Sequence, residues 1–373
     1  MTTDTQEVRA GRHRVAQRAL ALIEGEAGSL NSEIEAHYDE LNVVRLSDVT
    51  PETVSWLWPG YIPLGKLSVL EGDPGLGKST LALSIAAAVS RGRGLPGRLE
   101  CDPADVVLVS YEDGLADTIR PRLDAARADV HRVHAVQGIT HAGTHDETLI
   151  SFPTDSESVF DLVSELGAQL VIVDPLSAAL AGQIDSYKDA DIRRVLAPMA
   201  RFAEDSGAAV LVVRHLTKSG RRAITAGGGS IAIAAAARVV LAVHQDPDRP
   251  DDAGSRVLAP VKCNLSSKPA SLAFHLTSEA TGAVRVEWSG ESSHTADTLS
   301  SLRDDFENGA SEREMDEWLR AVLSEGPQTR KEVFRQAKGA AFSERSLDRA
   351  ATRLRVKRIQ SGFGKEKCSE WSL

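Results

Sequence analysis

The segment Gly72–Thr80 holds the residues whose types and spacing most clearly predict chemistry. It matches the pattern G-x-x-x-x-G-K-[ST], a loop that cradles the phosphates of a nucleoside triphosphate. Glycines let such a loop turn tightly and point backbone N–H groups at phosphate oxygens. Lys78 would reach the β- and γ-phosphates, and the hydroxyl of Ser79 would hold Mg²⁺. We therefore expect ATP and Mg²⁺ to bind the nine loop residues Gly72, Asp73, Pro74, Gly75, Leu76, Gly77, Lys78, Ser79 and Thr80.

The segments on either side of this loop have the pattern that a phosphate site needs. The short apolar run Leu67–Glu71 precedes it and predicts a buried strand. Residues 80–89 follow it, are rich in helix formers, and predict a helix that packs on a sheet. A strand, a glycine loop and a helix together place the phosphates at a helix N-terminus. The alternative is a glycine turn that fits the pattern by chance.

Three further apolar runs end in polar side chains that could act on the same phosphates. The run that ends in Asp174 offers a second carboxylate for Mg²⁺. The run that starts at Val106 is followed by Glu112, which could orient and deprotonate the attacking water, and by Asp113, which fits better as an N-cap. A third run ends in His215, which could sense the γ-phosphate or be an ordinary hydrogen-bonded histidine.

Strand-like runs alternate with helical stretches from about residue 51 to 289, which predicts an α/β core with a mostly parallel sheet. The expected strands are Leu67–Glu71, Val106–Ser110, Val133–Val136, Leu170–Val173, Val210–Val213, Val239–Val243, Val257–Val261 and Leu272–Leu276. We expect a helical or extended segment over 1–50, the core over 51–289, a polar linker over 290–311 and a small domain over 312–373.

The last segment predicts a winged helix-turn-helix. Helices are expected over Glu314–Ser324, over Lys331–Ala337 after an N-cap at Thr329, and over Glu344–Arg355 after an N-cap at Ser343. A hairpin turning at 362–364 would follow. The third helix would turn its arginines outward for duplex DNA, although winged helices also bind proteins; the expected DNA contacts are Arg345, Arg349 and Arg353.

Charge is distributed unevenly along the 373 residues. The net charge is −10, yet residues 328–373 hold twelve Lys and Arg against five acids, a local balance of +7. An acidic body with a basic end often marks an attached nucleic-acid module, and the alternative is a solvated helical surface. Three dispersed cysteines, no signal-like start and no run of about eighteen apolar residues predict a cytoplasmic protein without a membrane partner.

In their order along the chain, the motifs resemble those of the RecA-type ATPases. The loop, Glu112, Asp174, His215 and later Arg238 are most similar to the RepA-like hexameric replicative helicases and AAA ATPases of plasmids, phages and mobile elements. The resemblance covers roughly 51–289. It implies a RecA-like ring, a hexamer, with ATP at subunit interfaces, single-stranded DNA in the channel, and a separate primase or replication initiator as a partner.

The same resemblance assigns roles to individual residues. Glu112 resembles the catalytic base and His215 the sensor, while Arg238 is similar to an arginine that reaches a neighbour's phosphates; an ion pair on a helix is its alternative. Lys262 resembles a second residue acting across the interface, with Asn264 where DnaB-type helicases have arginine. The basic loop with Lys218, Arg221 and Arg222 resembles a channel loop that grips DNA, or is an ordinary solvated loop.

The resemblance thus implies a DNA-dependent ATPase of helicase type. Two other functions remain open at this point: a RecA- or RadA-like remodelling ATPase that does not unwind DNA, and a DNA-binding regulator whose oligomeric state ATP switches.

Overall fold

The computed structural model describes residues 43–141, 146–180, 188–215, 231–340, 342–361 and 368–373. Its contacts divide the chain into two units, Met1–Thr53 and Val54–Leu373. In the first unit the described residues contain a short 3-10 helix, η1 (Leu46–Asp48), and the rest of the predicted N-terminal segment lies outside them. Within the described ranges, no helix is long and apolar enough to cross a membrane.

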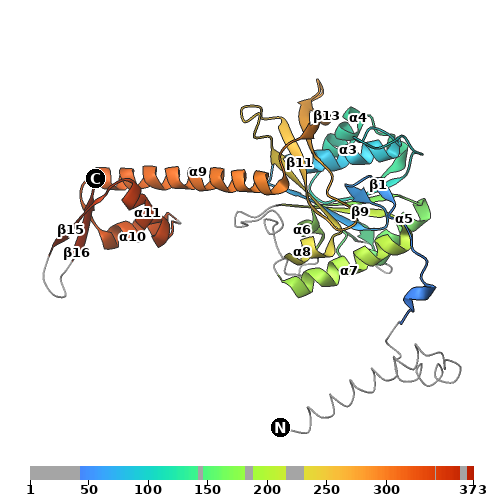
Figure 1. Ribbon diagram of the computed structural model, residues 1–373, viewed down its shortest axis with the longest axis horizontal. Helices are drawn as coiled ribbons and strands as arrows, with labels where there is room; N and C mark the ends of the chain where they lie inside the picture. Colours follow the sequence, from blue (N-terminus) through green and yellow to red (C-terminus); the bar gives the residue numbers. More distant parts are fainter. Residues whose placement is uncertain (1–42, 142–145, 181–187, 216–230, 341, 362–367) are drawn as a thin grey trace, which may run out of the picture. The chain divides into compact units, whose positions relative to one another are not determined.

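The second unit is built on a large sheet (Figure 1). In the described part of the chain, nine strands are hydrogen-bonded in the order β13-β12-β11-β10-β3-β9-β8-β4-β5. The strands from β10 to β5 run parallel, and β11, β12 and β13 extend the sheet antiparallel to them. This architecture is α/β with a mostly parallel sheet, and it fits a RecA-like P-loop core.

The eight strands that the sequence predicts are all present; two have the predicted bounds and six are slightly longer. The sheet strands are β3 (Leu67–Gly72), β4 (Val106–Ser110), β5 (Val133–Val136), β8 (Leu170–Asp174), β9 (Ala209–His215), β10 (Val239–Gln245), β11 (Ser255–Cys263), β12 (Ser271–Ser278) and β13 (Val284–Ser292). Two small hairpins lie outside this sheet: β1 (Trp56–Trp58) with β2 (Ile62–Pro63), and β6 (Ile139–Thr140) with β7 (Glu147–Thr148).

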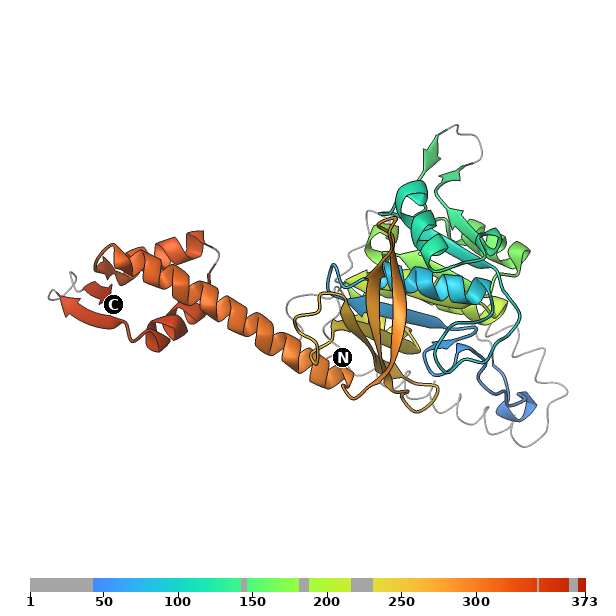
Figure 2. The same cartoon turned by 90° about the horizontal axis from the view of Figure 1, so that it is seen from above.

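Helices cover both faces of the sheet, because the parallel strands bury side chains on both sides. One face packs against α5 (Ser156–Leu166), α6 (Leu176–Ala179), α7 (Asp189–Ser206) and α8 (Ile231–Ala236). The other packs against α3 (Lys78–Ser90), the π-helical turn η2 (Leu115–Ile119) and α4 (Arg120–Ala125), and a 3-10 turn η3 (Val130–Arg132) precedes β5. Strand β13 contacts α3, and Figure 2 shows the two elements beside each other.

The predicted polar linker is wrong in its local structure. Residues 284–292 form the edge strand β13, and Ala296–Ser324 form one 29-residue helix, α9. Alternation of Val284, Val286 and Trp288 was a strand signal, and two of these side chains pack on the α3 face of the core. Helix α9 begins at a capping box in which Thr295 accepts a hydrogen bond from Thr298 N. The polar composition predicts a linker with one short helix at most, but it is also compatible with a long solvated helix.

The C-terminal residues form a second hydrophobic core. Its elements are the end of α9, β14 (Gln328–Thr329), α10 (Arg330–Gly339), α11 (Glu344–Arg353), β15 (Lys357–Ser361) and β16 (Cys368–Ser372). The three strands pair in the order β14-β16-β15. The predicted N-caps are confirmed, since Thr329 accepts from Glu332 N and Ser343 accepts from Ser346 N. The predicted turn at 362–364 lies outside the described residues.

Candidate nucleotide site

The polar strand ends predicted from the sequence lie at one edge of the sheet. The register pairs Gly72 of β3 with His215 of β9, and Ser110 of β4 with Asp174 of β8. Since β8 and β9 are hydrogen-bonded neighbours, the four strands end together at their carboxyl ends. Ligands of open α/β sheets bind outside this edge. The strand register therefore brings together residues that are far apart in the sequence.

The glycine loop leaves a cradle at the start of α3. Gly77 is the N-cap with a φ of 83°, and no side chain caps the helix. A Cβ at Gly77 would lie 2.6 Å from Cδ1 of Leu276, whereas a Cβ at Gly75 would meet no neighbouring atom within 4 Å. The first backbone N–H groups of an uncapped helix attract phosphate. The loop therefore fits a nucleotide.

Lys78 is held at the centre of this edge. Its ammonium donates to Asp73 O at 2.8 Å and lies 3.0 Å from Nδ1 of His215. Burial lowers the pKa of Lys78, and the carboxylates of Asp174 and Asp73 oppose that shift. Burial, and then the charge of Lys78, lower the pKa of His215. A neutral imidazole can accept a hydrogen bond from the ammonium at Nδ1.

Ser79 and Asp174 form the pair that would hold Mg²⁺. The Ser79 hydroxyl donates to the Asp174 carboxylate, and burial raises the pKa of Asp174 to about 6. A cavity of about 20 Å³ touches both side chains and Asp113, which is enough room for one water-sized group. A hydroxyl and a carboxylate are ligands that Mg²⁺ accepts, so the pair fits the ion.

Of the two acids after β4, Asp113 takes a different position from the one the sequence predicts. Asp113 does not cap the next helix; Gly114 is the residue before η2, and no side chain caps it. The Asp113 carboxylate instead accepts from Arg122 Nη1 at 2.7 Å. Glu112 is exposed, and in the described part of the chain it makes no hydrogen bond or ion pair. Its charge acts on Lys78, Asp174 and His215, which places the carboxylate near the site.

A buried ion pair beneath the site was missed by sequence reasoning. Arg214 donates to Oε2 of Glu71 from Nε at 2.8 Å and from Nη2 at 2.5 Å. The two side chains are 4% and 1% exposed. Glu71 precedes Gly72 and Arg214 precedes His215, so the pair joins the carboxyl ends of β3 and β9. Two residues of opposite charge at the next-to-last positions of largely apolar strands were the available signal.

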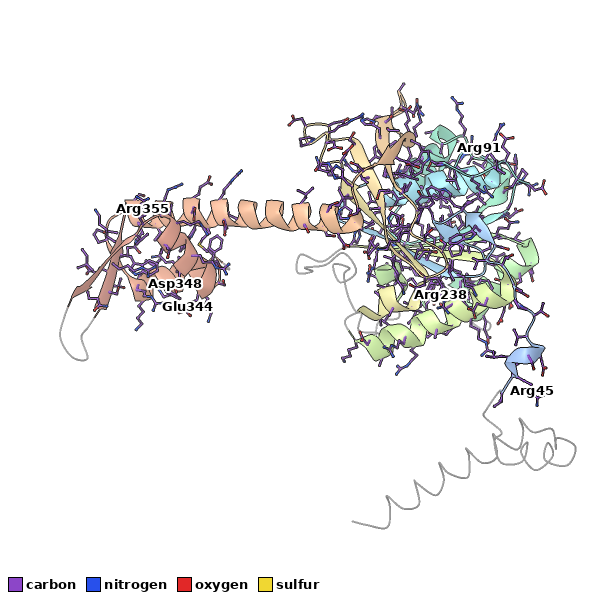
Figure 3. The ribbon with its side chains drawn as sticks, in the orientation of Figure 1. Arg45, Arg91, Arg238, Glu344, Asp348 and Arg355 are labelled. Atoms are coloured by element: carbon purple, nitrogen blue, oxygen red, sulfur yellow. The ribbon has the colours of Figure 1, made fainter. Side chains whose placement is uncertain are left out.

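Arg238 and Lys262 lie at the opposite edge of the sheet. Arg238, labelled in Figure 3, precedes β10, and its backbone N–H donates to Leu67 O at the start of β3. The length of β3, roughly 15–20 Å, therefore separates it from Gly72. Lys262 donates to the carbonyls of Ala234, Ala235 and Ala237 at 2.9, 3.2 and 2.7 Å, at the carboxyl end of α8. Neither reaches the phosphate loop of its own chain.

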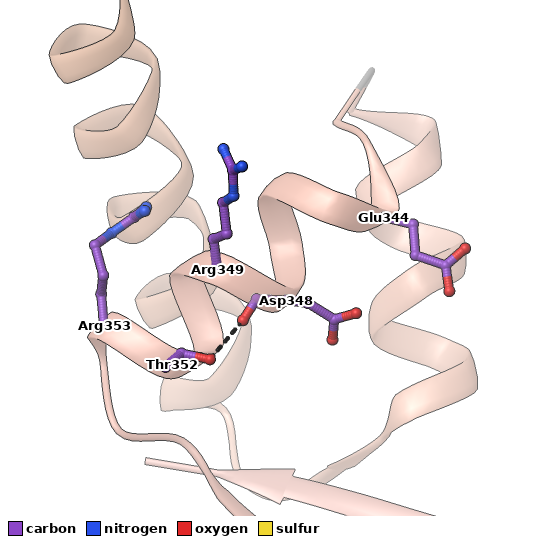
Figure 4. A pocket seen from close by; sticks show the side chains of 5 residues that line it. All are labelled: Glu344, Asp348, Arg349, Thr352 and Arg353. Atoms are coloured by element: carbon purple, nitrogen blue, oxygen red, sulfur yellow. Dashed lines mark hydrogen bonds between the residues drawn. The ribbon is translucent and has the colours of Figure 1, made fainter.

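The predicted DNA contacts are partly described. Lys218, Arg221 and Arg222, and the side chain of Arg345, lie outside what the structure describes. Arg349 is exposed and lines a groove on α11 with Glu344, Asp348, Thr352 and Arg353 (Figure 4). Arg353 is paired with α9, since its guanidinium lies 2.8 Å from Asp316 Oδ1 and 3.1 Å from Glu312 Oε1.

Together, the sheet order, the cradle and the Lys78–Ser79–Asp174 arrangement define a RecA-like P-loop core of the ATPase class. Comparison with known proteins agrees: residues 33–221 match the family described as AAA domain, and the chain belongs to that family.

Similar proteins include the DNA repair protein RadA of several bacteria. Identity is 28% over 163 residues for Halalkalibacterium halodurans, which is 43% of this chain and 30% of the relative. It is 26% over 163 residues for Bacillus subtilis, with the same two shares. It is 33% over 160 residues for Brucella abortus, which is 42% of this chain and 30% of the relative. The chain therefore matches less than a third of these relatives' length.

Proposed function

We propose that the chain is a DNA-dependent ATPase that works as a ring, translocates on single-stranded DNA as a replicative-type helicase, and hydrolyses ATP between subunits. The distance between Lys78 and Arg238 carries this proposal. Lys78, Ser79 and Asp174 gather at the carboxyl edge of the sheet, whereas Arg238 begins β10 at the amino edge. An arginine so placed does not reach the phosphate loop of its own chain, so any role in hydrolysis would be on the nucleotide of another subunit.

In this proposal each side chain has a separate task. Lys78 and the backbone of the loop bind the phosphates. The contact between the Lys78 ammonium and His215 breaks when the γ-phosphate binds and forms again when it leaves. Glu112 orients the attacking water and takes its proton. Mg²⁺ supplies charge neutralisation on the phosphates when it is bound by Ser79 and Asp174. Arg238 and Lys262 of a neighbour stabilise the charge that develops on the transferred group.

The C-terminal elements support a DNA-binding role. A helix, a short strand, two helices and a two-stranded hairpin follow one another there, with the edge strand β14 completing the sheet. We propose that this is a winged helix and that α11 faces duplex DNA with Arg349. The basic balance of residues 328–373 favours a polyanionic partner.

The main alternative is a remodelling ATPase that does not separate strands. The names of the relatives favour it, because they refer to DNA repair and do not mention unwinding. Strand displacement on a forked duplex distinguishes the two functions. Single-strand-stimulated ATP turnover without displacement would support the alternative, and no stimulation by any DNA would contradict both.

Mixing two inactive variants tests the shared site. Lys78→Ala and Arg238→Ala should each abolish turnover, and Arg238→Ala should keep nucleotide binding. The Arg238→Ala chain keeps an intact phosphate loop, and the Lys78→Ala chain keeps Arg238. In an equal mixture, these two intact parts meet at about a quarter of the interfaces, so activity should return. A mixture that stays inactive while it assembles, or an Arg238→Ala chain with normal turnover, would contradict the shared site.

A further inference from the structure

Two aspartates and a histidine form a cluster outside the nucleotide loop. Asp246 and Asp248 follow β10, and His294 precedes α9. Their ligand atoms all lie within 4.8 Å of one another, and His294 Nε2 is 3.0 Å from Asp248 Oδ1. Asp246 is only 7% exposed. Residues almost fifty positions apart in the sequence thus bring metal-ligating atoms together.

Local hydrogen bonds hold the Asp246 side chain and the two backbone segments that carry the cluster. Asp246 Oδ1 accepts from Asp248 N at 3.0 Å, and Arg249 N donates to Asp246 O at 3.2 Å. On the other side of the cluster, His294 N donates to Ser292 Oγ at 3.3 Å, and Thr295 caps α9. The turn after β10 and the start of α9 are therefore both ordered where they meet.

The imidazole of His294 lacks a hydrogen bond at the nitrogen that faces the carboxylates. Nε2 is buried, and among the described residues it has no hydrogen-bond partner, although Asp248 Oδ1 is close. Leaving a buried ring nitrogen without a hydrogen bond is unfavourable. A metal ion between the imidazole and the carboxylates would satisfy that nitrogen and balance the two negative charges.

We propose that Asp246, Asp248 and His294 bind a divalent transition-metal ion, Zn²⁺ or Mn²⁺, which ties the turn after β10 to the start of α9. Carboxylate oxygens and an imidazole nitrogen bind such ions at about 2.0–2.2 Å, which puts the ligand atoms roughly 3–4.4 Å apart. Small adjustments of the observed cluster give that spacing. Nitrogen in the ligand set favours these ions over Mg²⁺, which prefers oxygen.

The site uses none of the residues of the nucleotide loop, so it can be tested separately from ATP chemistry. We would load the full-length Asp174→Asn chain with Zn²⁺ or Mn²⁺ without nucleotide, remove excess ion by gel filtration, and measure bound metal by mass spectrometry. About one ion per chain should remain, and Asp246→Asn or His294→Gln should lose it. The matched control is His275→Gln, which removes the neighbouring His275–Asp252 pair at 3.1 Å and should keep the ion.

A second measurement on the unaltered chain does not depend on any variant folding. Hydrogen exchange of the backbone amides of Asp246, Asp248 and Arg249 and of residues 294–299 should slow about tenfold when the free ion is ten times its Kd, because opening releases the ion. Absence of bound metal from the Asp174→Asn chain, equal binding by His294→Gln, or unchanged exchange would each overturn the proposal. Binding that requires ATP would instead assign the ion to the nucleotide.

Discussion

The ammonium of Lys78 lies 3.0 Å from Nδ1 of His215, so the residue that would hold the phosphates is already in contact with the end of the neighbouring strand. The depressed pKa values of both groups follow from burial first. A phosphate that enters the loop would compete with His215 for the same ammonium. The contact therefore links nucleotide binding to the strand that leads into residues 216–230.

Replacing the histidine tests that link. His215→Ala should lower ATP turnover about 10²–10³-fold, as for other groups that act on developing charge, with much less effect on nucleotide affinity. Steady-state turnover and binding of a fluorescent nucleotide give the two values. His134→Ala is the control, because its ring pairs with Asp105 beside β5 and lies away from the loop. Equal loss of affinity and turnover would mean that His215 only shapes the pocket.

Removing the lysine should have a larger effect on binding. Lys78→Ala takes away the charge that the loop presents to the β- and γ-phosphates, so both affinity and turnover should fall. The control is Lys66→Ala, since Lys66 forms an exposed pair with Glu204 and contributes at most about 1 kcal/mol to stability. Turnover by Lys78→Ala within a few-fold of the unaltered chain would exclude this loop as the catalytic one.

Asp174 should make activity depend on both pH and Mg²⁺. Its pKa is raised to about 6, so the carboxyl group binds a proton as the pH falls through 6, and that proton competes with Mg²⁺. Turnover should fall in this window, and the fall should move to lower pH as Mg²⁺ is increased. Rate profiles at several Mg²⁺ concentrations measure this. A midpoint that does not move with Mg²⁺ would show that another group titrates.

The same carboxyl group should affect stability with a defined sign. The folded chain holds the proton more tightly than the unfolded chain, whose ordinary pKa is 3.8. The contribution of Asp174 to stability is therefore fully present below pH 4 and is lost as the pH rises through 6. Urea unfolding of Asp174→Asn should lose this part of the pH dependence. An unchanged pH dependence would contradict the assignment.

Removing one partner of the Glu71–Arg214 pair should lower the stability of the fold strongly, whereas replacing both partners by apolar residues should not. Arg214→Met leaves a buried carboxylate without its cation and should destabilise the fold by about 3–5 kcal/mol. Adding Glu71→Leu should restore most of that stability, because the double variant buries no charge. Urea unfolding measures both, with Arg120→Met of the exposed Arg120–Asp124 pair as the control. Full stability in the single variant would mean that the pair is not buried in solution.

Two arginines of α11 should differ in their effect on DNA. Arg349 is exposed, whereas Arg353 is paired with Glu312 and Asp316. Arg349→Ala should weaken binding and lower the slope of log K against log salt by about one, as expected for one lost phosphate contact. Arg353→Ala should act mainly on stability. Fluorescence anisotropy at several salt concentrations tests this, and salt-independent binding by the unaltered chain would contradict the DNA interface.

Short patterns and the rules of parallel sheets were enough to place Lys78, Asp174 and His215 at one edge. The strands are predicted from apolar runs and the loop from a local pattern, so the prediction required no knowledge of contacts between residues distant in the sequence. The pairing of Asp113 with Arg122, and of Arg353 with α9, depended on three-dimensional neighbours that no local pattern reveals. Strand β13 was missed because only its first part alternates apolar and polar residues, while the rest is polar. Helix α9 was missed because a solvated helix lacks a strong apolar periodicity.

The antiparallel strands have a consequence for how short a working chain can be. Leu276 of β12 occupies the space that a side chain at Gly77 would need, and Arg256 of β11 donates to Leu76 O at 3.2 Å. Both residues come after the stretch 33–221 that matches the family. A chain shortened to that stretch would keep every residue of the phosphate loop and would lose the contacts from β11 and β12 that support it. We therefore expect a shortened chain that still binds nucleotide to extend at least through residue 278, the end of β12.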